Sequence, residues 1–234
     1  MPGLLVTLRC RGLALAVLAF ALAACGRPDD RVLGGGPVLE SAAAYDGRPI
    51  VPVPFAATAG RHYVARLQQV DADAELALLD GTRLLARVAG PARGLGAEYL
   101  SFIVPEDREL RFEIRAVSPP GRSAGYSLQV HALPDDVPAD VVAAFERWTR
   151  AAAVAEPHPD ADRVLADLRA VESVWDVRDP ALAADVRLQI AAVEYWQRDD
   201  WGAAVDAAER AAADYGRARD AVAGADADVL AALA

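Results

Sequence analysis

The chain has 234 residues, and its 34 acidic residues outnumber its 24 basic ones, for a formal net charge of −10. Every basic residue is an arginine, and with no lysine in the chain, Schiff-base lysine chemistry is excluded. An acidic chain with scattered arginines is also a poor match for nucleic acid or for an anionic lipid surface.

The N-terminal residues have the layout of an export signal. Arg9 and Arg11 supply positive charge, and residues 12–26 form an uncharged run rich in leucine, alanine and valine. A helix over that run would rise about 22 Å, which is short of the roughly 30 Å hydrocarbon core of a bilayer. A cleaved signal is therefore favoured over a permanent transmembrane span.

The apolar run closes on Leu22-Ala23-Ala24-Cys25, which resembles the lipobox of bacterial lipoprotein signal peptides. The resemblance implies a signal peptide over residues 1–24, acylation of Cys25 with palmitate among the acyl groups, and a lipid anchor in the bacterial cell envelope. Gly26, rather than an aspartate, follows the cysteine and implies the outer membrane. The alternatives are an ordinary signal peptide cleaved nearby, with Cys25 incidental, and a plain membrane anchor.

Cleavage before Cys25 would also remove Cys10, the only other cysteine. The remaining chain would then hold no disulfide, no cysteine metal cluster and no free thiolate nucleophile.

The rest of the sequence predicts a multidomain α+β fold. A break at Pro134–Pro138 separates a part rich in strand signals from a part rich in helix signals. The predicted organisation is a flexible tether at 25–37, a β-sandwich at 38–133 and a helical repeat-like domain at 138–234.

Alternation of apolar and polar residues marks the strands. Between Glu109 and Val117, the apolar Leu110, Phe112 and Ile114 face one way and charged residues face the other. Six or seven short strands with no helix between them predict an antiparallel β-sandwich. The predicted elements are strands at 63–70, 76–79, 84–88, 100–104 and 126–132, a proline-interrupted edge strand at 50–55, and a hairpin turn at Asp80-Gly81.

Parts of this region resemble the bacterial pre-peptidase C-terminal-type β-sandwich. The resemblance rests on Ala59-Gly60 followed by Tyr63-Val64, on Leu76–Asp80, and on the closing Gly125–Val130. It implies a non-catalytic adjunct of a secreted or surface protein.

Helical periodicity follows the break. Apolar stripes predict helices at 140–156 and 160–174, and Asp179-Pro180 is a favourable start for the next helix. A further helix is predicted to be capped by Asp199 or Asp200 and to end near Gly216. The pattern over residues 218–234 predicts another helix.

The pair of helices over 188–216 resembles a tetratricopeptide repeat, which implies contact between two helices through small residues. The residues at its packing positions are Leu188, Ala192 and Tyr195 in the first helix and Trp201, Ala204, Ala208 and Ala211 in the second. Only about one and a half repeats are present, and such arrays typically need about three. We therefore expect the helical domain to be incomplete.

Candidates for chemistry are few. His62, His131 and His158 are expected to be solvated, and no His/Cys set has metal-ligand spacing. The acidic run Asp71, Asp73 and Glu75 lacks the further ligands of a calcium loop, so a solvated loop is favoured. No catalytic residue, metal or other cofactor is expected. The tryptophans are expected to pack in the helical part; they are Trp148, Trp175, Trp196 and Trp201.

These observations lead to the expectation of a non-catalytic, membrane-anchored lipoprotein that binds a protein or peptide in an acidic groove of its helical domain. The order of signal, sandwich and repeat-like helices resembles the N-terminal part of CHAT-domain (caspase-like) proteins, which implies a protease domain further along a longer chain. The alternative is a stand-alone lipoprotein that binds carbohydrate or another envelope component, for which aromatic residues should be exposed on one sandwich face.

Overall fold

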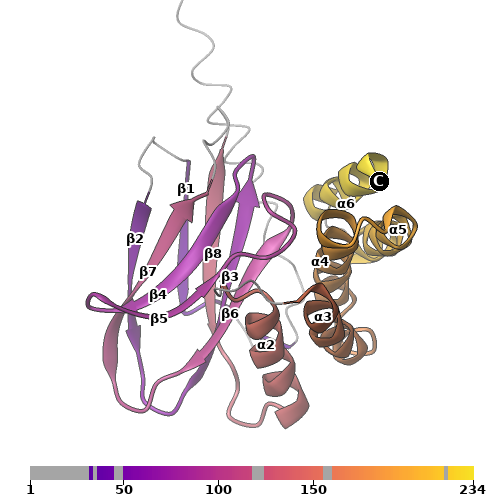
Figure 1. Cartoon of the computed structure of the whole chain (residues 1–234). Coiled ribbons are helices and arrows are strands. Elements are labelled where there is room, and N and C mark those ends of the chain that lie inside the picture. The colour runs from indigo at the N-terminus through magenta and orange to yellow at the C-terminus, as the bar shows by residue number, and fades with distance from the viewer. Residues whose placement is uncertain (1–31, 34–35, 45–49, 118–123, 155–159, 219–220) are drawn as a thin grey trace, which may run out of the picture.

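A computed structural model describes residues 32–33, 36–44, 50–117, 124–154, 160–218 and 221–234. Within these residues the fold is α+β, with two four-stranded antiparallel sheets followed by five helices (Figure 1). The signal-like segment and its lipobox lie outside the described residues.

The strands form two sheets of equal size. Sheet A has the order β1-β8-β3-β6, and sheet B has the order β2-β7-β4-β5. The strands are β1 (Leu39–Ala44), β2 (Ile50–Ala57), β3 (His62–Val70), β4 (Ala74–Asp80), β5 (Arg83–Val88), β6 (Ala97–Ile103), β7 (Arg108–Ala116) and β8 (Gly125–Ala132).

The inner faces of the two sheets share one apolar core. Leu110, Phe112 and Ile114 of β7 lie in it, as the alternation predicted, together with Leu100 of β6 and Leu128 of β8. Burial of one face of each strand accounts for the period of two in the sequence.

Two local predictions about the strands are confirmed, and one strand was missed. β2 is an edge strand of sheet B, as its Pro52 and Pro54 require, since proline has no backbone N–H to donate to a second neighbouring strand. The β4–β5 hairpin turns at Gly81, whose positive φ of 59° suits glycine. The sequence did not predict β1, which pairs with β8 at the edge of sheet A.

Five helices follow the strands. Three of them begin at an aspartate whose side chain accepts backbone N–H groups of the first turn: Asp160, Asp179 and Asp200. The helices are α2 (Ala139–Ala151), α3 (Ala161–Trp175), α4 (Pro180–Gln197), α5 (Trp201–Ala218) and α6 (Ala221–Leu233).

Two predicted helix ends are wrong. α2 ends at Ala151 rather than near residue 156, because Ala153 forms an isolated β-bridge with Val88, the last residue of β5. α5 continues through Gly216 to Ala218.

The helices lie on the side of sheet A that ends in β6, where α2 packs against that strand (Figure 1). A second apolar core joins Val64 of β3 and Ala97 and Tyr99 of β6 to side chains from all five helices. We call this contact layer the seam. Both faces of the central strands β3 and β8 are therefore buried along most of their length, which a sheet with one solvated face would not show.

Candidate functional site

A buried chain of hydrogen bonds crosses the seam. Tyr99 of β6 donates to one carboxylate oxygen of Asp185 on α4 at 2.5 Å, and Tyr215 of α5 donates to the other at 2.7 Å. Arg66 Nε of β3 donates to the Tyr99 hydroxyl at 3.0 Å. Asp185 is only 2% exposed, so these partners offset the cost of burying its charge. The arrangement ties a strand to two helices and leaves no open face for a substrate.

Helix side chains also form hydrogen bonds with backbone groups of β6 along the edge that pairs with no other strand of sheet A. Thr149 Oγ1 of α2 accepts the backbone N–H of Ser101 at 2.7 Å, and Gln189 Nε2 of α4 donates to the carbonyl of Ala97 at 3.2 Å. Trp148 Nε1 in turn donates to Gln189 Oε1 at 2.8 Å. Covering an edge strand with helices prevents pairing with another chain. The helices and sheet A thus depend on each other for their polar contacts.

Glu98 is a buried carboxyl group of β6 that has no salt bridge with the described residues. Burial raises its pKa to about 8, and the nearby charge of Asp73 acts in the same direction. The backbone N–H of Gly90 donates to its Oε2 at 2.6 Å, and Gln69 Nε2 lies 3.4 Å from its Oε1. A β-carbon at position 90 would lie 2.6 Å from that Oε2, so a larger residue there would displace the carboxyl group from this hydrogen bond. Glu98 therefore fixes the start of the segment that joins β5 to β6.

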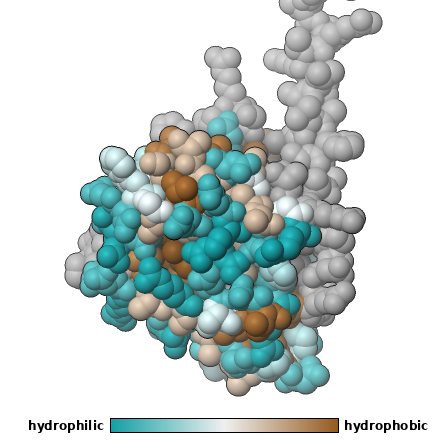
Figure 2. Space-filling view, turned by 90° about the vertical axis from the view of Figure 1, so that its right-hand side faces the viewer, coloured by the Kyte–Doolittle hydropathy of each residue, from teal (hydrophilic) through white to brown (hydrophobic). Residues whose placement is uncertain are grey.

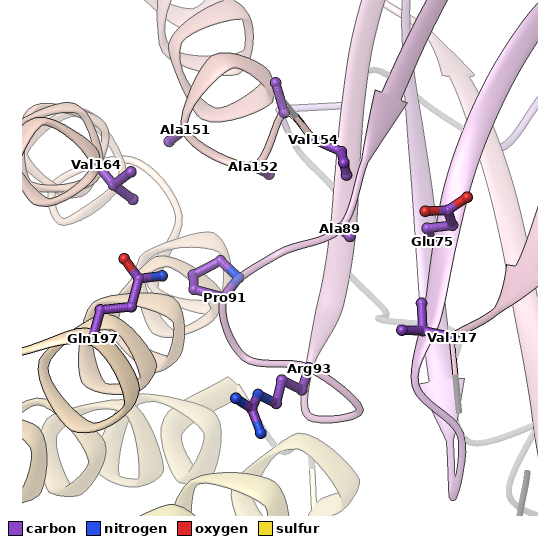
Figure 3. Close-up of a pocket in the computed structure, with 11 residues that line it drawn as sticks. Glu75, Ala89, Pro91, Arg93, Val117, Ala151, Ala152, Val154, Val164 and Gln197 are labelled. Atoms are coloured by element: carbon purple, nitrogen blue, oxygen red, sulfur yellow. The ribbon is translucent and has the colours of Figure 1, made fainter. Parts of the chain in front are cut away.

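That segment forms the centre of an open groove. The groove has a volume of about 570 Å³, within the usual range of ligand sites. Figure 3 shows Ala89, Pro91 and Arg93 on the segment, with Val164 and Gln197 on helices at one side and Glu75 and Val117 of the sheet part at the other. Its apolar lining is completed by Ala151, Ala152, Ala153 and Val154.

The charged groups of the groove differ in their surroundings. The Arg93 guanidinium lies 4.3 Å from the ring centre of Trp196, a cation–π contact that orients it at the rim. Glu75 lies 3.9 Å from Arg87 and 3.8 Å from Arg115, so its charge is balanced inside the sheet part. The groove is thus mainly apolar, and it is a different groove from the acidic one that the sequence predicts within the helical domain.

A cluster of charged side chains outside the groove links α3, α4 and α5. Arg187 of α4 contacts Glu172 at 2.7 Å and also pairs with Asp176 and with the buried Asp214 of α5, which Arg217 contacts as well. This cluster explains how polar residues can occupy the interior of the helical part.

The residues of the predicted repeat lie mostly in the interior. Leu188, Ala192, Ala204, Ala208 and Ala211 are all at most 1% exposed. Tyr195 is half-buried.

Trp201 does not pack as expected. Its side chain is 59% exposed, because it is the first residue of α5 and lies beyond the packed turns. Trp148 and Trp175 are fully buried, as predicted, whereas Trp196 is 39% exposed beside Arg93.

Cys25, with Leu22, Ala23 and Ala24, is outside the described residues. His62 lies 3.4 Å from Glu146, and His158 is outside the described residues.

His131 is a correction, because it is 2% exposed rather than solvated. Its strand face is covered by the rest of the molecule, which alternation alone did not reveal.

The run Asp71, Asp73 and Glu75 forms no metal site in the structure. Among the described residues, no three or more His, Cys, Asp or Glu side chains gather as metal ligands would. Asp73 has a pKa raised by burial, which Arg93 partly opposes.

Asp185, Tyr215 and Glu98 were not predicted from the sequence. α4 offered a signal for the first of them, because its apolar residues surround the helix instead of forming one stripe, which is typical of a helix buried on every side. Glu98 gave no such signal, because it lies on the same face of β6 as the core residue Leu100, where the alternation predicts an apolar side chain.

None of the helices within the described ranges is long and apolar enough to span a membrane. The chain matches no model of a known protein family and no curated protein sequence. Of the arrangements described, the groove is open to a ligand, whereas the buried networks of the seam are closed by their own contacts.

Proposed function

We propose that this protein is an exported, lipid-anchored, non-catalytic module that binds a protein or peptide partner in the groove at the seam. We further propose that its two sheets form a pre-peptidase C-terminal-type β-sandwich and that α4 and α5 form a tetratricopeptide-like hairpin. The anchor is proposed at Cys25, through the lipobox resemblance, in the outer membrane.

The observation that carries the binding proposal is the construction of the groove. Its lining comes from the sheet part (Glu75, Val117), from the β5–β6 segment and from three helices. The buried hydrogen bonds of Asp185 and Gln189 hold these elements together. A preformed apolar groove loses little conformational entropy when an extended peptide binds, which favours affinity.

The groove is also a better candidate than the outer helical face. Figure 2 shows that hydrophilic residues cover most of that face and that hydrophobic residues form small, separate patches. Exposed apolar side chains of the helical part such as Val177 and Val229 are single residues, which are normal on a soluble surface.

The lining of the groove supports a binding role rather than a catalytic one. Its titratable side chains in the described structure are Glu75 and Arg93, the first balanced by arginines and the second stacked on Trp196. General acid–base or nucleophilic catalysis needs a reactive group beside a partner that tunes it.

The carbohydrate-binding alternative has less support. It requires aromatic rings exposed on a face of the sheets, whereas Tyr63, Phe112 and Tyr126 lie in the inner core and Phe102 packs against it. Tyr99 is buried in the seam.

We also propose, from the order of the segments alone, that the chain is the N-terminal portion of a longer CHAT-type protease. An in-frame His…Cys protease region downstream of codon 234 would support this extension, and a stop codon at that point would refute it.

The lipid anchor is tested by metabolic labelling with a clickable palmitate analogue in the native bacterium. Wild type and Cys10→Ala should be labelled and recovered in the membrane fraction, whereas Cys25→Ala should lose the label. Equal labelling of Cys25→Ala would refute the anchor at this residue.

The groove is tested by selecting a random peptide library displayed on phage against the purified protein. An enriched consensus peptide should bind wild type and should lose at least about tenfold in affinity for Ala153→Trp, which fills the groove. Val177→Trp, at a position that is 82% exposed and outside the groove, is the matched control. Unchanged affinity for Ala153→Trp, or a selection without a consensus, would contradict the proposal.

A further inference from the structure

The segment expected to be a flexible tether contains a buried side chain. Leu33 is 2% exposed and belongs to the apolar core of the seam. Val32 packs against the same core, and the backbone N–H of Val38 donates to the carbonyl of Val130 at 2.8 Å, ahead of β1. The chain is therefore already part of the folded body at Leu33, well before the first strand.

The position of Leu33 limits the reach of the tether. Leu33 lies eight positions after Cys25, and a fully extended chain spans at most about 3.3–3.6 Å per residue, or about 26–29 Å in total. A tether free up to residue 37 would reach about 40–43 Å by the same measure.

We infer that Leu33 docks the N-terminal segment into the seam and holds the folded body against the membrane surface, within about 29 Å of the lipid on Cys25. This inference rests on the proposed lipid anchor. The partner surface is thus the bilayer, and a groove ligand must come from its immediate neighbourhood. Because the chain is acidic, this closeness comes from the short link and not from attraction to anionic lipid.

Docking is tested first by proteolysis, independently of any lipid. Trypsin cleaves this chain only at arginine, and Arg31 lies two residues before Leu33. Burial of a leucine side chain corresponds to roughly a 10- to 100-fold change in an opening equilibrium. Cleavage after Arg31 should therefore be about 10- to 100-fold faster in Leu33→Asp than in wild type.

Val38→Asp is the matched control, because Val38 is 53% exposed and the substitution makes the same change of charge. Its cleavage rate after Arg31 should stay near that of wild type. Cleavage after Arg122 serves as an internal reference for protease activity, and near-equal melting temperatures exclude general unfolding. Equal rates in wild type and Leu33→Asp would overturn the docking of Leu33.

The reach is tested by coupling residues 25–234 to a maleimide lipid in a supported phosphatidylcholine bilayer. Cys25 is the only thiol in these residues, so the attachment is specific. Neutron reflectometry should place the protein layer no more than about 29 Å from the headgroups in wild type and farther out in Leu33→Asp. A wider gap in wild type would overturn the inference. An unlabelled wild-type protein in cells, or equal palmitate labelling of Cys25→Ala, would instead refute the anchor and leave the docking result standing.

Discussion

Replacement of Glu98 by glutamine should remove a large part of the pH dependence of stability. In the folded protein, burial raises the pKa of this carboxyl group from its ordinary 4.5 to about 8. The unfolded chain therefore releases the proton above about pH 4.5, whereas the folded protein keeps it up to about pH 8.

The sign and size of the effect follow from this difference. The free energy of unfolding contributed by Glu98 is complete below pH 4.5 and is lost as the pH rises to about 8. One proton corresponds to about 1.4 kcal/mol per pH unit, so stability falls by about 4 kcal/mol between pH 5 and pH 8. A typical domain has only about 5–15 kcal/mol in total.

Glutamine is suited to the test because it has nearly the same shape and stays neutral at every pH. Its side-chain carbonyl can still accept the backbone N–H of Gly90, which lies 2.6 Å from the carboxyl oxygen of Glu98. We expect the free energy of unfolding of Glu98→Gln, from urea titrations followed by circular dichroism, to fall about 4 kcal/mol less than that of wild type between pH 5 and pH 8.

Glu113→Gln is the matched control. Hydrogen bonds from Arg115 lower the pKa of Glu113, so its contribution is lost only as the pH falls through the acid range. This variant should keep the wild-type slope above pH 5. Parallel profiles for wild type and Glu98→Gln between pH 5 and pH 8 would refute the assignment of the proton to Glu98.

Three further predictions concern the helices and can be checked by urea denaturation. Tyr215→Phe should lower the free energy of unfolding by about 1–3 kcal/mol, because one oxygen of the buried Asp185 loses its donor; a neutral effect would mean that this bond does not hold the seam. Asp179→Ala should cost about 1 kcal/mol, because the N-cap of α4 is lost, and no change would argue against the cap. Trp148→Ala should lower the free energy of unfolding by about 3–5 kcal/mol, because this side chain is fully buried. Trp201→Ala should lower it by less than about 0.5 kcal/mol, because Trp201 is 59% exposed. Similar losses in the two variants would contradict these positions.

Local patterns in the sequence determined most of the secondary structure and its caps. Alternation located β7 and the inner residues Leu110, Phe112 and Ile114, because a sheet face in contact with apolar neighbours repeats every second residue. Asp179-Pro180 located the start of α4, because an aspartate that accepts first-turn N–H groups acts within a few residues. The lipobox is likewise a local motif, and it is the basis of the proposed anchor.

The tertiary structure decided what covers the outer face of sheet A, and with it the candidate site. His131 lies on the face of β8 opposite to the core residues Leu128 and Val130, and such a position looks the same in sequence whether water or the rest of the molecule lies over it. The helices that complete the seam come from residues 139–233, far along the chain. Leu33, the Asp185 network and the groove all depend on that contact, because they form only where distant segments meet, and no local period encodes which segments those are.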